Sequence, residues 1–413
     1  MHRRVVVTGL GLVSPVGNSA PETWDSLVAG RSGAARIRQF DPSSLDVQFA
    51  CEIKDFDPLQ FMDRKEIKRS DRFVHYAMAA CEEAMRDSGL NGTLPDRDRT
   101  GVIIGSGVGG IGTFEEQCTL FIKKGPRRVS PFFVPMFIPD MASGLVSMRY
   151  GAKGPNYCTV SACSSSAHAL GESYRLVQRG DADMMITGGA EAAVRPLAIA
   201  GFSNMKALSM RNDAPEQASR PFDKDRDGFV MGEGSGIVIV ESLESALSRG
   251  ARIRAEILGY GMSADAYHMT QPAPGGEGAR RAMVECLEDG QIDRSRIGYV
   301  NSHGTATPHG DIAETQAVKD LFGDAAWDLI MGSTKSMTGH LLGAAGALEF
   351  SVSAMVMENG VIPPTINLDH PDPECDLNYA GNQVVEREVD VSLSNSFGFG
   401  GHNVTLALGR FHD

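Results

Sequence analysis

Residues 159–170 read TVSACSSSAHAL and predict the start of an amphipathic helix that carries a cysteine in its first turn. Counted from Cys163, small or apolar residues recur at offsets of 4, 7, 11 and 14, which is the spacing of one helix face. Ser161 stands at the position of an N-cap, ahead of that turn. The residues on this face are Ala167, Leu170, Tyr174 and Val177.

Outward from this helix, short runs rich in β-branched residues alternate with longer helical patterns. Such alternation is typical of α/β folds, in which strands are buried between layers of helices. The pattern starts again near Gly250, so a duplicated architecture is an open alternative. The predicted strands are residues 4–8, 101–105, 183–187, 236–240, 254–258, 297–301 and 329–332.

The bulk composition limits the classes of function. The chain has 413 residues, 42% of them hydrophobic, which is enough to bury one large core or two fused ones. Its net charge of −13 argues against nucleic-acid binding and means that an acidic partner would need a local basic patch. The sequence shows neither an export signal nor a run of about 18 apolar residues, so we expect a soluble, cytoplasmic protein without a membrane span.

The cysteines and glycines exclude several kinds of site. Seven cysteines without a C-x-x-C pair argue against a disulfide framework and against structural zinc, so we expect most to be reduced and buried. The G-x-G-x-x-G spacing from Gly107 to Gly112 is that of a dinucleotide-binding loop, but no strand-ending acidic residue follows about 20 residues later. Close helix packing is the better interpretation of these glycines.

Cys163 is the first candidate for chemistry. At the start of a helix, the unpaired backbone N–H groups and the positive end of the helix dipole favour a thiolate, which is the form that attacks carbon electrophiles. A buried structural cysteine is the alternative, and it is how we interpret the other six cysteines.

Two histidines in the second half stand at the ends of predicted elements. His303 follows the strand at 297–301, at the edge where strands usually expose functional residues. His340 is expected to open a helix, where the dipole favours the neutral imidazole. Neutral imidazoles can donate N–H groups to the enolate that forms when a malonyl thioester loses carbon dioxide. For either histidine alone, a hydrogen-bonded core residue or a metal ligand is the alternative.

Two further features stand near these histidines in the sequence. Glu349 is the only charged residue between Lys335 and Glu358, and a carboxylate on so apolar a helix is costly unless paired. Lys335 or a bound cation is its expected partner, with a surface glutamate as the alternative. The stretch FGFGGHN at 397–403 could bring backbone N–H groups close to a ligand, although a plain β-turn is the simpler interpretation.

Taken together and in this order, these segments resemble the β-ketoacyl-(acyl carrier protein) synthases, most closely synthase II of bacterial type II fatty-acid synthesis. The resemblance covers essentially the whole chain. Besides the stretches at 159–170 and 397–403, it is carried by VVVTGLG at 5–11, PFFVP at 131–135, RPFDKDRDGFV at 220–230 and PPTINL at 363–368.

The resemblance implies a decarboxylative Claisen condensation, in which an acyl thioester held on Cys163 is joined to malonyl-(acyl carrier protein) to give a 3-ketoacyl product and carbon dioxide. It implies that His303 and His340 stabilise the enolate and that the ion pair of Lys335 and Glu349 orders the second histidine.

The resemblance also implies how substrates are held. The backbone N–H groups of Cys163 and Phe399 would form the oxyanion hole, with the Phe399 ring as a gate, and Thr305 and Thr307 would bind the phosphopantetheine arm. The acyl tunnel would be lined by Val108, Phe202 and, from a second subunit, Phe133. The basic patch for the acidic carrier protein would consist of Lys65, Arg69, Arg127, Arg128 and Lys206, with Lys68 beside them.

The implied fold is the thiolase-like α/β arrangement of five layers, αβαβα, with two related halves at residues 1–252 and 253–413 and a homodimer as the assembly. Neither a cofactor nor a metal in the site is implied, although a structural monovalent cation near Glu349 stays open. Three positions depart from the family pattern: Ser166 replaces a glycine, His402 a threonine and Ala306 a serine. The first could narrow the entrance near Cys163, and the second adds a titratable group near Phe399.

Three other functions are the alternatives, and the residues argue against the first two. A non-catalytic chain-length-factor subunit resembles these synthases but has lost the nucleophile, whereas Cys163, His303 and His340 occur together here. A cysteine hydrolase needs one imidazole with an orienting Asp or Asn rather than two histidines. A polyketide ketosynthase uses the same chemistry on other acyl chains, and the sequence pattern does not exclude it.

Overall fold

The computed structural model describes residues 2–412. Within that range, ten strands form one continuous mixed sheet in the order β10-β9-β13-β14-β8-β1-β7-β6-β4-β5. The strands of the first half are β1 (Val5–Val13), β4 (Thr100–Gly105), β5 (Asn156–Tyr157), β6 (Met184–Glu191) and β7 (Gly234–Ser242). The strands of the second half are β8 (Ala255–Ala264), β9 (Ile297–Asn301), β10 (Ile330–Gly332), β13 (Val391–Gly398) and β14 (His402–Gly409).

The two halves of the sheet repeat one topology. If the five strands of each half are numbered 1 to 5 along the chain, they lie side by side in the sheet in the order 3-2-4-5-1 in both halves. The first two neighbouring pairs of that order are parallel and the last two are antiparallel, in both halves. The halves join where Val5–Val7 pairs with Ala255–Ile257. This repeat confirms the prediction of an α/β fold built from two related halves. The predicted boundary after residue 252 lies just ahead of β8 and stays a prediction.

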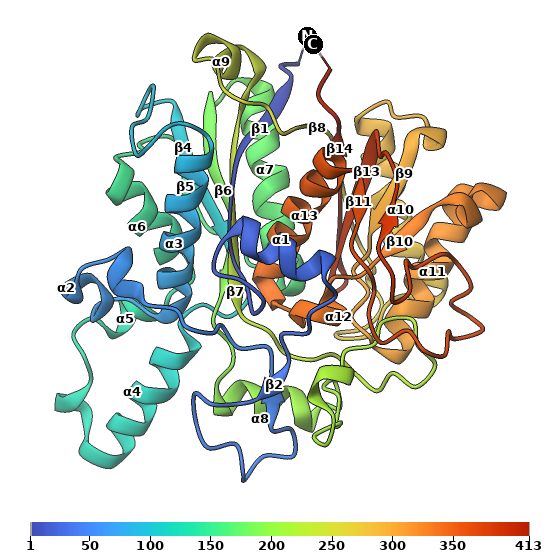
Figure 1. The fold of residues 1–413 in the computed structure, drawn as a ribbon. Coiled ribbons are helices and arrows are strands. Elements are labelled where there is room, and N and C mark those ends of the chain that lie inside the picture. The colour runs from blue at the N-terminus through green and yellow to red at the C-terminus, as the bar shows by residue number, and fades with distance from the viewer. Residues whose placement is uncertain (1, 413) are drawn as a thin grey trace.

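Helices cover both outer faces of the sheet and fill a layer between its halves (Figure 1). The helices α3 (Arg72–Asp87) and α6 (Met141–Tyr150) pack on the outer face of the first half, and α10 (Glu277–Asp289) and α11 (Pro308–Phe322) lie on the far side of the second. Between the halves lie α7 (Ser165–Arg179) and α13 (Ala345–Asn359), which contact each other and strands of both halves. The five layers of the thiolase-like fold follow from this order.

The middle layer explains the apolar sequence of α13. Its residues are buried without interruption from Ala345 to Met357, because the helix packs against β7, β13 and α7 at once. A helix enclosed on all sides carries no polar stripe. Glu349 therefore lies inside the protein and is not a surface glutamate.

The remaining helices and strands lie around this core. Among residues 2–412, no helix is both long and apolar enough to span a bilayer. The first and last described segments lie close together, since the Arg4 guanidinium lies over the Phe411 ring, 5.4 Å from its centroid. The other helices are α1 (Ala20–Val28), α2 (Arg64–Ile67), α4 (Ile111–Lys124), α5 (Phe133–Phe137), α8 (Pro196–Asn204), α9 (Leu243–Ser248) and α12 (Lys335–Thr338), and the short strand pairs are β2 (Ala35–Arg36) with β3 (Phe49–Ala50) and β11 (Val361–Ile362) with β12 (Val385–Glu386).

Candidate active site

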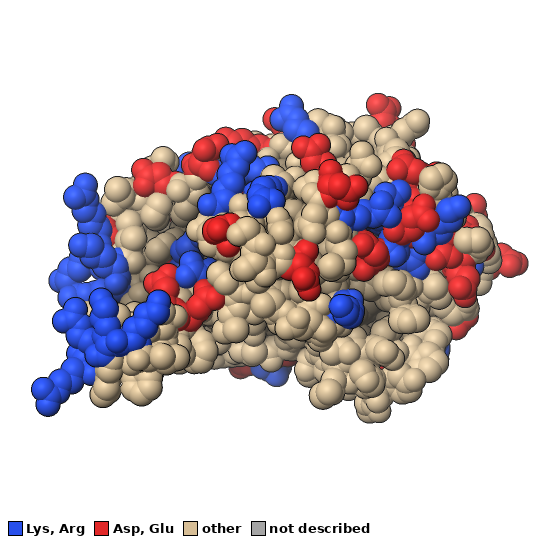
Figure 2. Space-filling view, turned by 90° about the horizontal axis from the view of Figure 1, so that it is seen from below, with Lys and Arg blue, Asp and Glu red and all other residues tan. Residues whose placement is uncertain are grey.

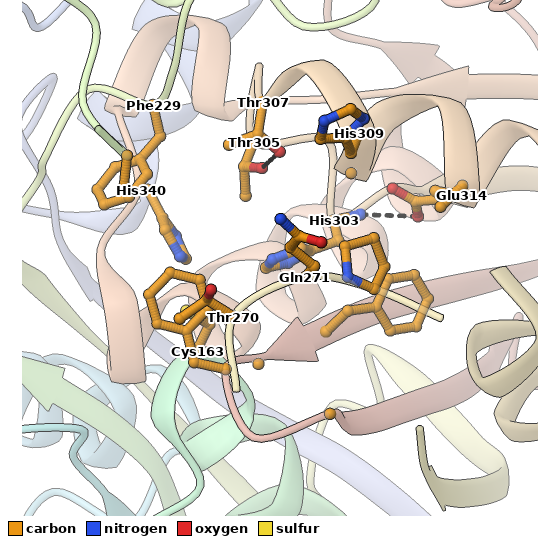
Figure 3. A pocket seen from close by; sticks show the side chains of 18 of the residues that line it. Cys163, Phe229, Thr270, Gln271, His303, Thr305, Thr307, His309, Glu314 and His340 are labelled. Carbon is orange, nitrogen blue, oxygen red and sulfur yellow. Dashed lines mark hydrogen bonds between the residues drawn. The ribbon is translucent and has the colours of Figure 1, made fainter. Parts of the chain in front are cut away.

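A pocket of about 250 Å³ lies at the ends of the two middle-layer helices where Cys163 precedes α7 and His340 precedes α13. Both residues line it, as does His303, which follows β9. Figure 3 shows the side chains of these three residues converging from separate segments. The pocket therefore gathers residues from both halves of the chain.

Cys163 lies in a 3-10 turn, Ala162–Ser164, that runs directly into α7. Ala162 has a positive φ of 51°, so the backbone turns sharply just before the thiol. The predicted N-cap does not act through its side chain: the Ser161 hydroxyl hydrogen-bonds Nδ1 of His168 at 2.7 Å. Cys163 therefore lies in a 3-10 turn just ahead of α7 and not in the first turn of the α-helix itself, and Ser161 precedes that turn without capping it through its hydroxyl.

The protonation state of Cys163 differs from the prediction. Burial raises the pKa of its thiol to about 12, and the positive charge of Lys335 and the backbone N–H of Phe399 offset this only in part. The expectation that the helix start would favour a thiolate was wrong for the resting site. Burial destabilises the thiolate by more than the nearby N–H groups and dipoles stabilise it. In this environment Cys163 is a neutral thiol.

His303 is held by a carboxylate that was not among the predicted site residues. Its backbone N–H and that of Gly304 each donate to Glu314 of α11, both at 2.9 Å. Burial, with the charge of Lys335 and the neighbouring His340, lowers the pKa of the His303 imidazole well below its usual value. The ring is therefore neutral.

His340 does not open a helix, contrary to the prediction. It follows Gly339, which ends α12, and its backbone bridges to the segment Val230–Gly232: its N–H donates to Val230 and its carbonyl accepts from Gly232. Burial and Lys335 lower the pKa of its imidazole well below the usual value, so the neutral form has a different cause from the dipole that the sequence suggested. Within the described part of the chain neither ring nitrogen has a hydrogen-bond partner.

The three side chains lie within reach of one reacting group. The thiol of Cys163 and one nitrogen each of His303 and His340 all lie within 4.8 Å of one another. The two imidazole rings are 5.4 Å apart at nearly a right angle. A cluster of one thiol and two imidazoles is also a possible set of ligands for a cation. The positive charge of Lys335, which acts on all three groups, would repel a bound cation. That no metal belongs in the site stays an expectation.

Lys335 and Glu349 form an ion pair with side chains that are 1% and 2% exposed. Lys335 acts on His340 through its charge and not through a hydrogen bond between described atoms. Burial raises the pKa of Glu349 to about 7, while the lysine acts in the opposite direction. The two partners suggested by the sequence are therefore side by side, at the buried end of the site.

The stretch at 397–403 is both a β-turn and a wall of the pocket. It connects β13 to β14 through Phe399, Gly400 and Gly401, and both glycines have positive φ angles, 86° and 74°. A Cβ on Gly398 would lie 2.7 Å from the carbonyl oxygen of Ser161, so only glycine lets this hairpin approach the cysteine turn. The backbone N–H groups of Phe399 and Cys163 both act on the thiol.

The predicted substrate-binding residues fall into two groups. Thr305 and Thr307 line the pocket with their hydroxyls 3.0 Å apart, and Phe202 lines it with its ring 6.3 Å from that of Phe399. Val108 and Phe133 are not among the described residues that line this pocket. Val108 packs in a neighbouring apolar cluster, and Phe133 stacks on Phe137.

The predicted basic patch also divides into two places. Lys65 and Arg69 lie at α2, and Arg127 and Arg128 lie in the 3-10 turn after α4, where Lys and Arg gather at one end of the face in Figure 2. Lys206 instead lines the mouth of the pocket. Of the five residues, it alone is a described part of the pocket wall.

The three positions that the resemblance singled out as departures are not among the described residues that line the pocket. The Ser166 side chain is fully buried and its Oγ accepts the backbone N–H of Ala347 at 3.0 Å, so it ties α7 to α13 and does not narrow the entrance. His402 is exposed and faces His168, with their rings 6.5 Å apart. Ala306 is buried and has a positive φ of 66°, a conformation that costs energy for any residue with a side chain.

Sequence reasoning missed Glu314 and Glu191, two carboxylates that are almost fully buried. The signal for Glu314 was available: it shares a helix face with Ala317, Val318 and Leu321, at spacings of 3, 4 and 7, where an unpaired acid would be costly. No comparable pattern distinguishes Glu191, which ends strand β6.

Two family models match this chain. The Beta-ketoacyl synthase N-terminal domain matches residues 2–246, and the Beta-ketoacyl synthase C-terminal domain matches residues 254–369. The chain belongs to the β-ketoacyl synthase family. It is 53% identical to a 3-oxoacyl-(acyl-carrier-protein) synthase 2 from Synechocystis over 409 residues, which cover 99% of this chain and 98% of the relative.

Solved structures of β-ketoacyl synthases share the fold. A β-ketoacyl synthase from Burkholderia phymatum superposes with a TM-score of 0.93 at 36% identity, covering 99% of this chain and all of the other. A type II PKS ketosynthase, solved in complex with its acyl-carrier protein and bound to the hexaketide, superposes with a TM-score of 0.92 at 33% identity over 100% of both chains. The thiolase-like fold implied by the sequence is therefore confirmed.

Proposed function

We propose that this β-ketoacyl synthase performs the decarboxylative condensation of an acyl thioester with malonyl-(acyl carrier protein), as a 3-oxoacyl-(acyl carrier protein) synthase of fatty-acid elongation. The observation that carries the proposal is the convergence of one thiol and two neutral imidazoles within 4.8 Å, in a pocket lined by Phe399 and by two threonines. The names of the similar relatives support the substrate class.

The first half-reaction loads the acyl group on Cys163. The thiol loses its proton as its sulfur attacks the acyl thioester, and a neighbouring neutral imidazole can accept that proton. The backbone N–H groups of Cys163 and Phe399 then stabilise the negative oxygen of the tetrahedral intermediate. The carrier thiol leaves with a proton, and the acyl group remains on Cys163.

The second half-reaction forms the new carbon–carbon bond. Malonyl thioester loses carbon dioxide, and the electron pair of the broken bond delocalises onto the thioester oxygen. The ring nitrogens of His340, which have no partner among the described residues, suit the donation of an N–H to that oxygen, and His303 can do the same. The enolate carbon attacks the acyl carbonyl and expels the Cys163 sulfur as a thiolate, which gives the 3-ketoacyl product. The thiolate then takes up a proton from water and returns to the thiol form.

The local basic residues favour acyl carrier protein as the partner, despite the acidic net charge of the chain. A net charge of −13 repels an acidic protein at long range, whereas the basic residues at α2, after α4 and at the pocket mouth offer it a local docking surface. We place the phosphopantetheine arm along Thr305 and Thr307. The acyl chain would run past Phe202 towards Val108.

The assembly is a homodimer in our proposal. The outermost strand of the first half, β5, presents a free edge, and Tyr157 and Val160 beside it are exposed apolar side chains. A second copy pairing there would cover that edge and could bring Phe133 of the partner subunit to the acyl tunnel. Sedimentation of the wild type and of Val160→Asp tests this: dissociation of a dimer by the substitution supports it, and a wild-type monomer contradicts it.

Substitution of Cys163 tests the proposed reaction. Cys163→Ala should abolish condensation while malonyl decarboxylation continues, because only acyl transfer needs the sulfur. Cys163→Gln should decarboxylate faster than Cys163→Ala, because an amide can occupy the position of the acylated thiol. Measuring 3-ketoacyl product and carbon dioxide separately decides this. Condensation by the alanine variant would exclude Cys163 as the nucleophile.

A further inference from the structure

Cys163 has a structural counterpart in the second half of the chain. The turn at 162–164 and α7 are matched by the turn at 342–344 and α13, at a constant offset of 180 residues. Ala162 and Leu342 have nearly equal positive φ angles, 51° and 48°, and both helices contain 15 residues. Gly343 therefore occupies the position that corresponds to the nucleophile.

A buried carboxylate fills the space at this counterpart turn. Glu191, at the end of β6, is fully buried and accepts the backbone N–H of Gly343 at 3.0 Å. A Cβ on Gly343 would lie 2.6 Å from the Glu191 carboxylate and 2.2 Å from the backbone nitrogen of Gly107. This turn cannot hold a nucleophile, because the carboxylate occupies the place that a side chain would need.

The same carboxylate holds the loop after β4. One oxygen of Glu191 accepts from the backbone N–H of Gly107 at 2.7 Å, and the other accepts from Val108 at 3.2 Å and from the Ser106 hydroxyl at 3.0 Å. With Gly343, these make four donors on one carboxylate. Burial raises the pKa of the Glu191 carboxyl to about 7, and the four donors act in the opposite direction, so the hydrogen bonds offset only part of the cost of burying its charge. The carboxyl group joins two segments from different halves of the chain.

Glu314 also holds a loop through hydrogen bonds from backbone N–H groups. It accepts from the consecutive N–H groups of His303 and Gly304, as Glu191 does from Gly107 and Val108. Each loop directly follows the second strand of its half, β9 and β4. Both glutamates therefore hold a loop of the pocket region by its backbone, and neither is needed to neutralise a nearby cation.

His340 depends on such backbone restraints. Its ring nitrogens have no partner among residues 2–412, so its position is set by the chain on either side and by contact with Phe229, 5.3 Å away between rings. On one side its backbone is bridged to Val230–Gly232. On the C-terminal side of His340, the next such backbone contact is three residues later, where the N–H of Gly343 donates to Glu191.

We propose that Glu191 is a positioning residue for the condensation: by joining Gly343 to the Val108 loop, its carboxylate fixes both His340 and one wall of the acyl site. The inference rests on the proposed function and adds a residue to it. Glu191 touches no reacting atom. Its effect is on the turnover of bound substrate and on the length of acyl chain accepted, and not on docking of the carrier.

The test compares Glu191→Gln with a matched control, Glu83→Gln. Glu83 is also a largely buried carboxylate that accepts two backbone N–H groups, from Leu12 and Ala20, but it lies at α3, away from the pocket. The amide keeps the size of the side chain and replaces one acceptor oxygen by a donor. Steady-state condensation is measured for both variants with acyl carrier proteins of several chain lengths, after folding has been verified by circular dichroism.

For Glu191→Gln we expect kcat to fall about tenfold or more, with KM for the carrier protein unchanged within about twofold and a changed order of chain-length preference. Glu83→Gln should keep the wild-type kcat and the wild-type order. The pH profile of Cys163 alkylation should also move to lower pH in Glu191→Gln only, since burial chiefly and the Glu191 charge in addition raise the pKa of that thiol.

A Glu191→Gln enzyme with the kcat, chain-length order and alkylation profile of Glu83→Gln would overturn the inference. If Glu191→Gln does not fold, Ser106→Ala decides instead, because it removes one donor and leaves the carboxylate: kcat lowered about twofold to tenfold supports the inference, and an unchanged kcat overturns it. Failure of the wild type to condense would contradict the proposed function itself, so the two failures are distinguishable.

Discussion

At the scale of single residues, the site is dominated by the cost of burying charge. Cys163 is a thiol and both histidines are neutral because their surroundings exclude water, and the buried cation Lys335 acts on all three. A lysine placed there must itself be neutralised, which Glu349 does. Removing one partner leaves the other charged and unpaired in the core.

Lys335→Ala should therefore lower both stability and activity. We expect the free energy of unfolding to fall by about 3–5 kcal/mol, since Glu349 loses its partner, and the condensation rate to fall about tenfold or more. Denaturant titration and steady-state kinetics measure the two effects. The double variant Lys335→Met with Glu349→Gln is the control: it should recover stability but not rate. Normal stability and rate in Lys335→Ala would show that Glu349 has another partner.

The buried Glu83 gives a pH prediction. Burial raises its pKa to about 7, above the roughly 4.3 of an exposed glutamate, so the folded state binds more protons than the unfolded state between these values. Stability then falls as pH rises through this window. Relative to Glu83→Gln, the wild type should lose up to about 3 kcal/mol between pH 4.5 and 7, as followed by denaturant titration. A pH-independent difference between the two proteins would contradict the raised pKa.

At the scale of elements, two helices from different halves of the chain are fastened together in the middle layer. The Ser166 hydroxyl of α7 accepts the N–H of Ala347 in α13, and Gly346 packs against Ala167 so closely that a Cβ would lie 3.0 Å away. Because Cys163 and His340 precede these two helices, their distance depends on this contact.

Ser166→Ala tests the contact. Loss of the acceptor should lower the free energy of unfolding by about 1–3 kcal/mol, because the N–H of Ala347 stays buried. Ser173→Ala is a matched control on the same helix, since its hydroxyl is equally buried and has no partner among the described residues. It should have little effect on thermal unfolding. A shift in chain-length preference in Ser166→Ala, without loss of stability, would instead indicate that Ser166 does shape the entrance of the pocket near Cys163.

At the scale of the whole molecule, the charge is unevenly distributed. The chain carries a net charge of −13, yet α2 and the turn after α4 present a cluster of exposed Lys and Arg (Figure 2). Local clusters of this kind steer an acidic protein through its rate of association.

Arg127→Glu with Arg128→Glu should raise KM for acyl carrier protein strongly and leave kcat, and turnover of small acyl-pantetheine mimics, nearly unchanged. Added salt should bring the wild type towards the variant, since exposed charges are screened over about 8 Å at physiological ionic strength. The control reverses Arg179, the last residue of α7, and Arg252, which lies in the segment before β8 and contacts Glu358 of α13. It makes the same change of charge. Equal loss with carrier-bound and small substrates would show that the carrier docks elsewhere.

The sequence by itself determined the local features of this protein. All seven predicted strands fall on observed strands, and His303 does follow one of them, because strand and helix periodicity is set by neighbouring residues. The helix start at Cys163 was predictable for the same reason. The resemblance over the whole chain supplied the five layers, which periodicity alone did not.

Only the tertiary structure decided how these features act. Cys163, His303 and His340 come together through packing of segments 140 and 177 residues apart, and the same packing removes water and so reverses the expected pKa shift of the thiol. Ser166 faces a helix and not the entrance because its side chain meets α13 there. Glu191 gave no signal at all, since the four donors around its carboxylate come from two distant segments that only the folded chain brings to one point.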